Sequence, residues 1–126
     1  MLRMGDSPGR GRGVFAARPI GVGETIEDAP VIVVPRVDVE HLKRTLLFDY
    51  YFLWGEASGD AAVCLGFGSI YNHSERPNAA YVRLFAHRTI RFRALRDIAE
   101  GEEIFTDYHG GRARDASYGF ESEAQT

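Results

Sequence analysis

Short runs of alternating apolar and polar residues, separated by glycine-rich turns, restrict this chain to a mostly β architecture. In the clearest run, Ile90, Phe92 and Ala94 alternate with arginines. A period of two puts the apolar side chains on the core face of a strand and the arginines on the other face. We therefore expect segment 80–95 to form a hairpin that turns near His87.

The other segments give weaker signals of the same kind, together with one short helix. Asp38 is a candidate N-cap for this helix, and Val39, Leu42 and Leu46 follow it at a spacing of three and four. The sum is a mostly β or α+β domain. Further strands are expected at 14–17, at 25–35 in one or two pieces with Pro30 at an edge or bend, at 50–54 and 61–67 as a hairpin, and from Glu103 after a turn at Glu100–Gly101.

The length and the residue usage are those of one self-sufficient domain. The chain has 126 residues, of which 44% are hydrophobic, so a core can form without a metal or a disulfide. Cys64 is the single cysteine, which excludes an internal disulfide and a cysteine-cluster zinc site, and its apolar neighbours predict a buried thiol. No metal site is expected, because the four histidines lack a ligand spacing.

The charge and the hydropathy exclude two classes of partner. The net charge is −3, which argues against a general nucleic-acid binder even though four arginines make residues 3–18 locally basic. The first residues do not resemble a signal peptide, and no apolar run approaches the length of a membrane span. We expect an intracellular, cytoplasmic protein that does not enter membranes.

Three polar blocks stand apart from the strand pattern, and each alone has an ordinary structural interpretation. In "SPGRGRGVFAAR" the glycines allow a tight turn or the close approach of a ligand. In "GFGSIYNHSERPNA" Asn72 and Asn78 can satisfy backbone groups of a rigid, irregular loop. In "GEEIFTDY" Asp107 and Tyr108 follow a strand, where a tyrosine usually only packs.

Taken in this order, "GRGVFA", "NHSERPN" and "GEEIFTDY" resemble the signature blocks of the SET-domain protein lysine methyltransferases. The resemblance spans Gly11 to Tyr108, and "LGFGSIYNHS" is most similar to the minimal stand-alone SET proteins of bacteria and large viruses. It implies a β-clip fold of several short sheets with one short helix and a C-terminal pseudoknot. A single SET domain would then fill residues 1–126, with a core at about 8–109 and a tail at 110–126 that closes the cofactor site.

The resemblance also implies a chemistry, namely methyl transfer from S-adenosylmethionine to the ε-amine of a protein lysine. Tyr108 and Tyr50 would be the catalytic tyrosines, and Tyr71 would join them as a wall of the lysine channel. Arg12 stands where some relatives have a tyrosine, and a cysteine-rich zinc tail is missing, so an aromatic tail or a second subunit would close the site. The implied cofactor-binding residues are Arg10, Gly11, Arg12, Gly13, Asn72, His73 and Tyr108, with Tyr118 or Phe120 stacked on adenine.

Two other classes of function stay open at this point. A catalytically silent SET-like module could bind a protein tail, although such a binder has no need of Asn72, His73 and Tyr108 together. A small homodimeric scaffold could use the aromatic segment 50–54 as its interface, and a dimer is also compatible with the enzyme. The substrate lysine could belong to a histone-like tail, a ribosomal protein or a host protein.

Overall fold

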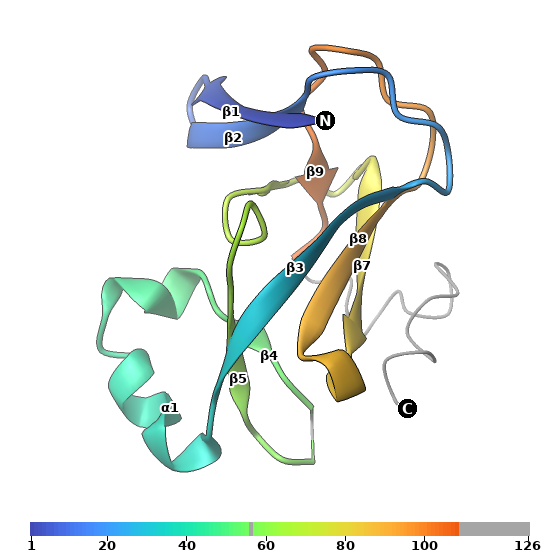
Figure 1. Ribbon diagram of the computed structural model, residues 1–126. Helices are drawn as coiled ribbons and strands as arrows, with labels where there is room; N and C mark the ends of the chain where they lie inside the picture. Colours follow the sequence, from blue (N-terminus) through green and yellow to red (C-terminus); the bar gives the residue numbers. More distant parts are fainter. Residues whose placement is uncertain (56, 109–126) are drawn as a thin grey trace.

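The computed structural model describes residues 1–55 and 57–108, and within these ranges the strands form three small sheets (Figure 1). The predicted mostly β fold with one short α-helix is thus confirmed for the described residues. This part of the chain also contains two short 3-10 helices that the sequence did not predict. In chain order the elements are β1 (Leu2–Ser7), β2 (Gly11–Ala16), β3 (Thr25–Val34), α1 (Arg36–Leu42), η1 (Leu46–Asp49), β4 (Phe52–Leu53), β5 (Ala61–Cys64), β6 (Asn72–His73), β7 (Ala79–Leu84), η2 (Phe85–His87), β8 (Thr89–Ala94) and β9 (Phe105–Thr106).

The largest sheet has the strand order β4-β5-β3-β8-β7, and β3 runs through its middle (Figure 1). β3 is one continuous strand that changes partner at Pro30: residues 25–30 pair with β8, and residues 31–34 pair with β5. Proline has no N–H to donate to a ladder, which suits it to such a change of partner. Its carbonyl still accepts a hydrogen bond from Leu65 N at 2.9 Å.

The predicted hairpin at 80–95 is confirmed. β7 and β8 pair antiparallel from Ala79↔Ala94 to Leu84↔Thr89, and the chain turns through η2. Ile90 and Phe92 are fully buried in the core, as their alternation with arginines predicted. The hairpin of β4 and β5 is present too, but β4 is shorter than expected and Tyr50 lies before it.

The helix begins differently from the prediction. Asp38 is not the N-cap, because that position is occupied by Pro35, whose side chain makes no capping hydrogen bond. Asp60 takes over part of this task, since its Oδ1 accepts a hydrogen bond from Arg36 N at 2.9 Å. Leu46 belongs to η1 and not to α1, and its side chain is exposed.

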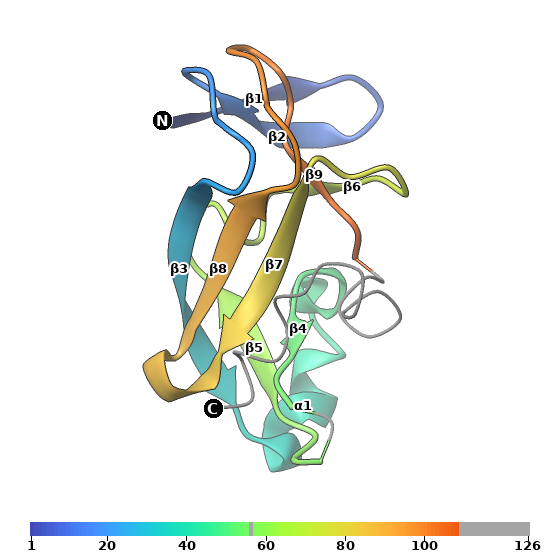
Figure 2. The ribbon, with the colours of Figure 1, turned by 90° about the vertical axis from the view of Figure 1, so that its right-hand side faces the viewer.

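The β1–β2 hairpin lies at one end of the molecule, beside the segment that leads to β9 (Figure 2). The sequence predicted only the 14–17 part of it. Val14 O accepts a hydrogen bond from Ile104 N at 2.8 Å, and Phe15 and Glu103 form an antiparallel bridge. The glycine-rich block is therefore attached directly to the segment that carries the third motif.

The second and third motifs meet in a short parallel pair. β6 pairs with β9, with Asn72 opposite Phe105 and His73 opposite Thr106. The sequence predicted a rigid, irregular loop here, and the Asn-His pair is instead a two-residue strand within that irregular segment. The close contact between the two segments, which the resemblance implied, is present.

Candidate active site

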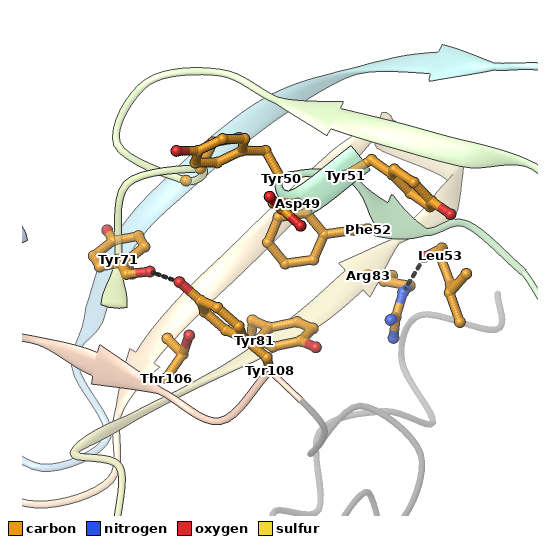
Figure 3. A pocket seen from close by; sticks show the side chains of 12 residues that line it. Asp49, Tyr50, Tyr51, Phe52, Leu53, Tyr71, Tyr81, Arg83, Thr106 and Tyr108 are labelled. Carbon is orange, nitrogen blue, oxygen red and sulfur yellow. Dashed lines mark hydrogen bonds between the residues drawn. The ribbon is translucent and has the colours of Figure 1, made fainter. Parts of the chain in front are cut away.

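A cavity of about 310 Å³ lies between the η1–β4 segment, the turn before β6 and the residues that follow β9 (Figure 3). Tyr50, Tyr71 and Tyr108, which the sequence analysis named as channel residues, all line it. The cavity therefore has an aromatic wall, to which acidic, basic and small residues add polar atoms. The complete lining is Asp49, Tyr50, Tyr51, Phe52, Leu53, Gly68, Ser69, Tyr71, Tyr81, Arg83, Thr106 and Tyr108.

Tyr108 is held at both its backbone and its hydroxyl. Its N–H donates to His73 Nδ1 at 3.0 Å, and its hydroxyl donates to the carbonyl oxygen of Tyr71 at 2.7 Å (Figure 3). Partial burial, with the neighbouring Tyr50 phenol, raises the pKa of Tyr108 above its ordinary value. The phenol is thus protonated at neutral pH and can donate this hydrogen bond.

Tyr71 contributes differently from what a channel wall suggests. Its side chain is only 2% exposed, and its hydroxyl points away to donate to Glu27 Oε1 at 2.7 Å. Burial and the Glu27 carboxylate raise the pKa of Tyr71. The polar group that Tyr71 offers to Tyr108 is its backbone carbonyl, whereas Tyr50, 42% exposed, comes from the η1 side (Figure 3).

The His73 ring holds the segment that follows β9. Its Nδ1 is the acceptor of the hydrogen bond from Tyr108 N. The buried Asp107 carboxylate lies 3.8 Å from the same Nδ1. Asn72–His73 and Asp107–Tyr108, which come from two of the motifs, therefore lie in direct contact.

The glycine-rich block approaches the same place from the β1–β2 hairpin. Asn72 Nδ2 donates to the carbonyl oxygen of Arg12 at 2.9 Å, and the Arg10 guanidinium lies 5.1 Å from the ring centroid of Phe105. Gly11 has φ +83°, and no heavy atom lies within 4 Å of the place where its Cβ would be. The loop thus has a backbone that suits glycine, with open space beside it.

Glu103 joins these elements, and the sequence analysis missed it as a site residue. Its carboxylate accepts hydrogen bonds from Ser7 Oγ at 2.8 Å and from Asn72 Nδ2 at 2.9 Å. A Cβ at Gly13 would overlap this carboxylate. Gly13 is therefore needed to make room for Glu103. In the sequence Glu103 is the third residue of a Gly-Glu-Glu turn, where a solvated charge is the usual interpretation.

Asn78 fixes the segment before β9. Its Nδ2 donates to Glu103 O at 2.8 Å, and its Oδ1 accepts from Phe105 N at 2.8 Å, while the residue is only 1% exposed. The prediction that Asn72 and Asn78 satisfy backbone groups is confirmed, because each bonds the main chain of another segment.

Known proteins are similar to this chain in sequence and in fold. The SET domain profile matches residues 11–109. A histone-lysine N-methyltransferase of Schizosaccharomyces pombe, specific for lysine 37 of histone H3, is 34% identical over 108 residues, which are 85% of this chain and 72% of that protein. A crystal structure of a Plasmodium falciparum protein described as a histone methyltransferase superposes with a TM-score of 0.69 at 26% identity, covering 86% of this chain and 97% of that one.

Larger assemblies contain the same fold. A humanized mutant of the Chaetomium thermophilum Polycomb Repressive Complex 2, bound to the inhibitor GSK126, gives a TM-score of 0.72 at 25% identity over 87% of this chain and 15% of the other. The architecture is thus that of a SET domain. The chain belongs to the SET-domain family, whose members use S-adenosylmethionine, and it is a protein lysine methyltransferase.

Two expectations concern other parts of the chain. Tyr118 and Phe120, named as candidates for stacking on adenine, lie outside the described residues. Among residues 1–55 and 57–108, no helix is both long and apolar enough to cross a bilayer, and no group of three potential metal ligands occurs.

Proposed function

We propose that the aromatic cavity is the channel for the substrate lysine and that the methyl donor binds beside it, against the glycine-rich loop and Asn72–His73. The observation that carries this proposal is the contact of three motifs around Tyr108. The loop reaches Asn72 through the Arg12 carbonyl, and His73 holds the Tyr108 backbone. A donor site and an acceptor channel would thus share the wall built by residues 71–73 and 105–108.

The residues present fit S-adenosylmethionine. The guanidinium groups of Arg10 and Arg12 suit its carboxylate, and the open space at Gly11 lets main-chain groups come close to it. The Asn72 amide nitrogen donates to the Arg12 carbonyl and to the Glu103 carboxylate. The amide oxygen is then the group that would accept a hydrogen bond from the ammonium of S-adenosylmethionine. When bound, this compound supplies an electrophilic methyl group on a positively charged sulfur.

The channel must deliver a neutral amine, because an ammonium has no lone pair to attack a methyl group. A free lysine has a pKa of about 10.4, so neutralising it at pH 7 costs roughly 4 to 5 kcal/mol at about 1.36 kcal/mol per pKa unit. Burial among Tyr50, Tyr81 and Tyr108 removes water from the ammonium and lowers its pKa. Burial alone can shift a lysine by up to about 3 to 5 units, so a dedicated general base is not required.

Tyr108 would orient the amine and limit the space around it. Its hydroxyl donates its proton to the Tyr71 carbonyl, so the oxygen of the hydroxyl still has lone pairs that can accept a hydrogen bond from the amine. Correct alignment of two reactants can lower a barrier by up to roughly 7 to 11 kcal/mol. The Tyr108 hydroxyl oxygen and the Tyr71 carbonyl oxygen would also fill space next to the amine, which restricts the number of methyl groups that fit.

The proposed substrate is a lysine in a histone tail. The relatives from Schizosaccharomyces pombe and Plasmodium falciparum are both described as histone methyltransferases, which supports this choice over a ribosomal or other protein. The bacterial or viral stand-alone type, the closing of the site by residues 110–126 and the homodimer stay predictions. A sedimentation measurement would decide the last of these.

The test uses the whole chain, labelled S-adenosylmethionine and a mixture of core histones. We expect label on a histone lysine. We also expect Tyr108→Phe to slow the transfer by up to about 100-fold, because the amine loses a group that aligns it with the methyl donor. Glu75→Gln, on the exposed loop after His73, is the control and should keep the wild-type rate. Full activity of Tyr108→Phe with an unchanged degree of methylation would remove the role assigned to this tyrosine.

A further inference from the structure

We propose that Glu27 is a positioning residue for methyl transfer: through Tyr71 it fixes the carbonyl that holds the Tyr108 hydroxyl, and it thereby sets the degree of methylation. Glu27 lies on β3, outside the three sequence motifs. The inference rests on the proposed function of the cavity, and it adds a residue that does not line the cavity itself.

Both oxygens of the Glu27 carboxylate bind the turn that precedes β6. Oε1 accepts from the Tyr71 hydroxyl at 2.7 Å, and Oε2 accepts from Phe67 N at 2.9 Å. One carboxylate thus holds both ends of the segment 67–71. Gly66 comes just before this turn with φ +61°, and a Cβ there would overlap the Glu27 carboxylate. The turn is therefore built closely around this side chain.

The neighbouring acid on the same strand behaves quite differently. Asp28 is exposed and pairs with Arg91, with N–O distances of 2.8 and 3.1 Å, in the manner of an ordinary surface ion pair. Successive side chains of a strand point to opposite faces, so Glu27 faces the site while Asp28 faces away. A half-buried carboxylate costs free energy unless hydrogen bonds compensate it, and here the donors come from the turn.

Tyr71 can transmit this constraint because it is rigid. Its ring is buried and packs on Phe92, with a distance of 4.5 Å between ring centroids. Glu27 holds the hydroxyl end, and the backbone at the other end presents the carbonyl that accepts from Tyr108. If the hydroxyl is released, the turn can shift and take this carbonyl with it. A displacement of about 1 Å near the reacting groups can cost about 100-fold in rate.

The decisive variant is Glu27→Gln, compared with Asp28→Asn one position away. Glutamine keeps the size but has only one acceptor oxygen. If that oxygen stays on Phe67 N, the Tyr71 hydroxyl faces an NH2 group, and its own proton loses the acceptor that fixes its direction. We expect kcat to fall about tenfold and the ratio of dimethyl to monomethyl product to change by about threefold or more, with KM for S-adenosylmethionine nearly unchanged. Asp28→Asn should match the wild type in all three quantities. Mass spectrometry of the product and steady-state kinetics give these values.

A second variant separates positioning from mere folding. Tyr71→Phe removes the same hydrogen bond from its other side, so it should change the product ratio in the same direction, and adding Glu27→Gln to it should cause little further change in that ratio. If Glu27→Gln fails to fold, Tyr71→Phe alone must show the change. A Glu27→Gln protein with a lower Tm but the wild-type kcat and product ratio would overturn the proposal. A wild-type protein that neither binds S-adenosylmethionine nor methylates lysine would instead refute the proposed function, and this inference with it.

Discussion

The Asn78→Ala substitution should lower the free energy of unfolding by about 3 kcal/mol, because it leaves two partly buried backbone groups without their side-chain partner. These groups are the carbonyl of Glu103 and the N–H of Phe105, each hydrogen-bonded to the Asn78 side chain at 2.8 Å. An unsatisfied buried polar group costs about 1 to 3 kcal/mol, so two such groups would cost about 2 to 6 kcal/mol. Partial exposure and relaxation of the segment keep the expected loss in the lower half of that range, at about 3 kcal/mol.

A change of this size is easily measured. With an unfolding entropy of roughly 2.1 cal/mol/K per residue, about 3 kcal/mol corresponds to a Tm that is lower by about 10 °C. Urea unfolding, followed by the fluorescence of Trp54, gives the free energy directly. Glu75→Ala, three residues earlier on the exposed loop, is the matched control and should stay within about 0.5 kcal/mol of the wild type.

The reasoning would be refuted if Asn78→Ala lost less than about 1 kcal/mol, since one unpaired group alone accounts for that amount. Such a result would mean that water replaces the amide at little cost. The variant should also bind S-adenosylmethionine more weakly, because Glu103 and Phe105 lie in the segment that carries the Asn72 contact and the Arg10 stack.

Three further outcomes follow from the described contacts. Asn72→Ala should weaken S-adenosylmethionine binding by at least about tenfold, measured by calorimetry, and an unchanged Kd would exclude Asn72 from that site. Arg96 lowers the pKa of Glu102 below its ordinary value of 4.5. As the pH drops below 4.5 the unfolded chain takes up the proton before the folded one, so the stability of the fold should fall. The loss should be small because the pair is exposed, and thermal melts should show a weaker pH dependence for Glu102→Gln. Burial raises the pKa of Cys64 to about 12, so its thiol should react with Ellman's reagent only after unfolding, and rapid labelling of the native protein would contradict its buried placement.

The parts of the fold that could be predicted are those with a local signal. Strand β8 is predictable because its side chains face the core and the solvent in turn, which produces the alternating pattern in the sequence. The turn before β9 is predictable because its backbone needs a positive φ, +85° at position 101, and this conformation favours the glycine found there. β1 was missed because a strand with glycine and charged residues at its centre owes its conformation to pairing with β2. Asp38 was wrongly chosen as a helix cap, because the residue that bonds the first helical N–H, Asp60, lies 24 positions away.

The difference between local and long-range signals also explains which candidate site residues could be predicted. Asn72, His73 and Tyr108 stand in short motifs that can be read from neighbouring letters. Glu27 and Glu103 accept hydrogen bonds from partners that are 31 to 96 positions distant. Glu27 lies outside the three motifs, and although Glu103 lies inside "GEEIFTDY", its neighbours do not indicate that its carboxylate binds Ser7 and Asn72. Only the fold brings such residues together, so the motifs indicated the residues proposed to contact the reactants but not the acids that hold the surrounding segments.

The short parallel ladder between β6 and β9 also determines when activity can arise. Its strands are separated by about thirty residues, and closing so long a loop costs entropy before the two hydrogen-bonded rungs can compensate it. During synthesis, a nascent chain in which Thr106 is still inside the ribosome lacks part of both the proposed donor site and the proposed lysine channel, however well its central sheet has formed. Catalytic competence should therefore arise in a single late step, and a trimmed product that lacks the last of these strands should be inert without being unfolded.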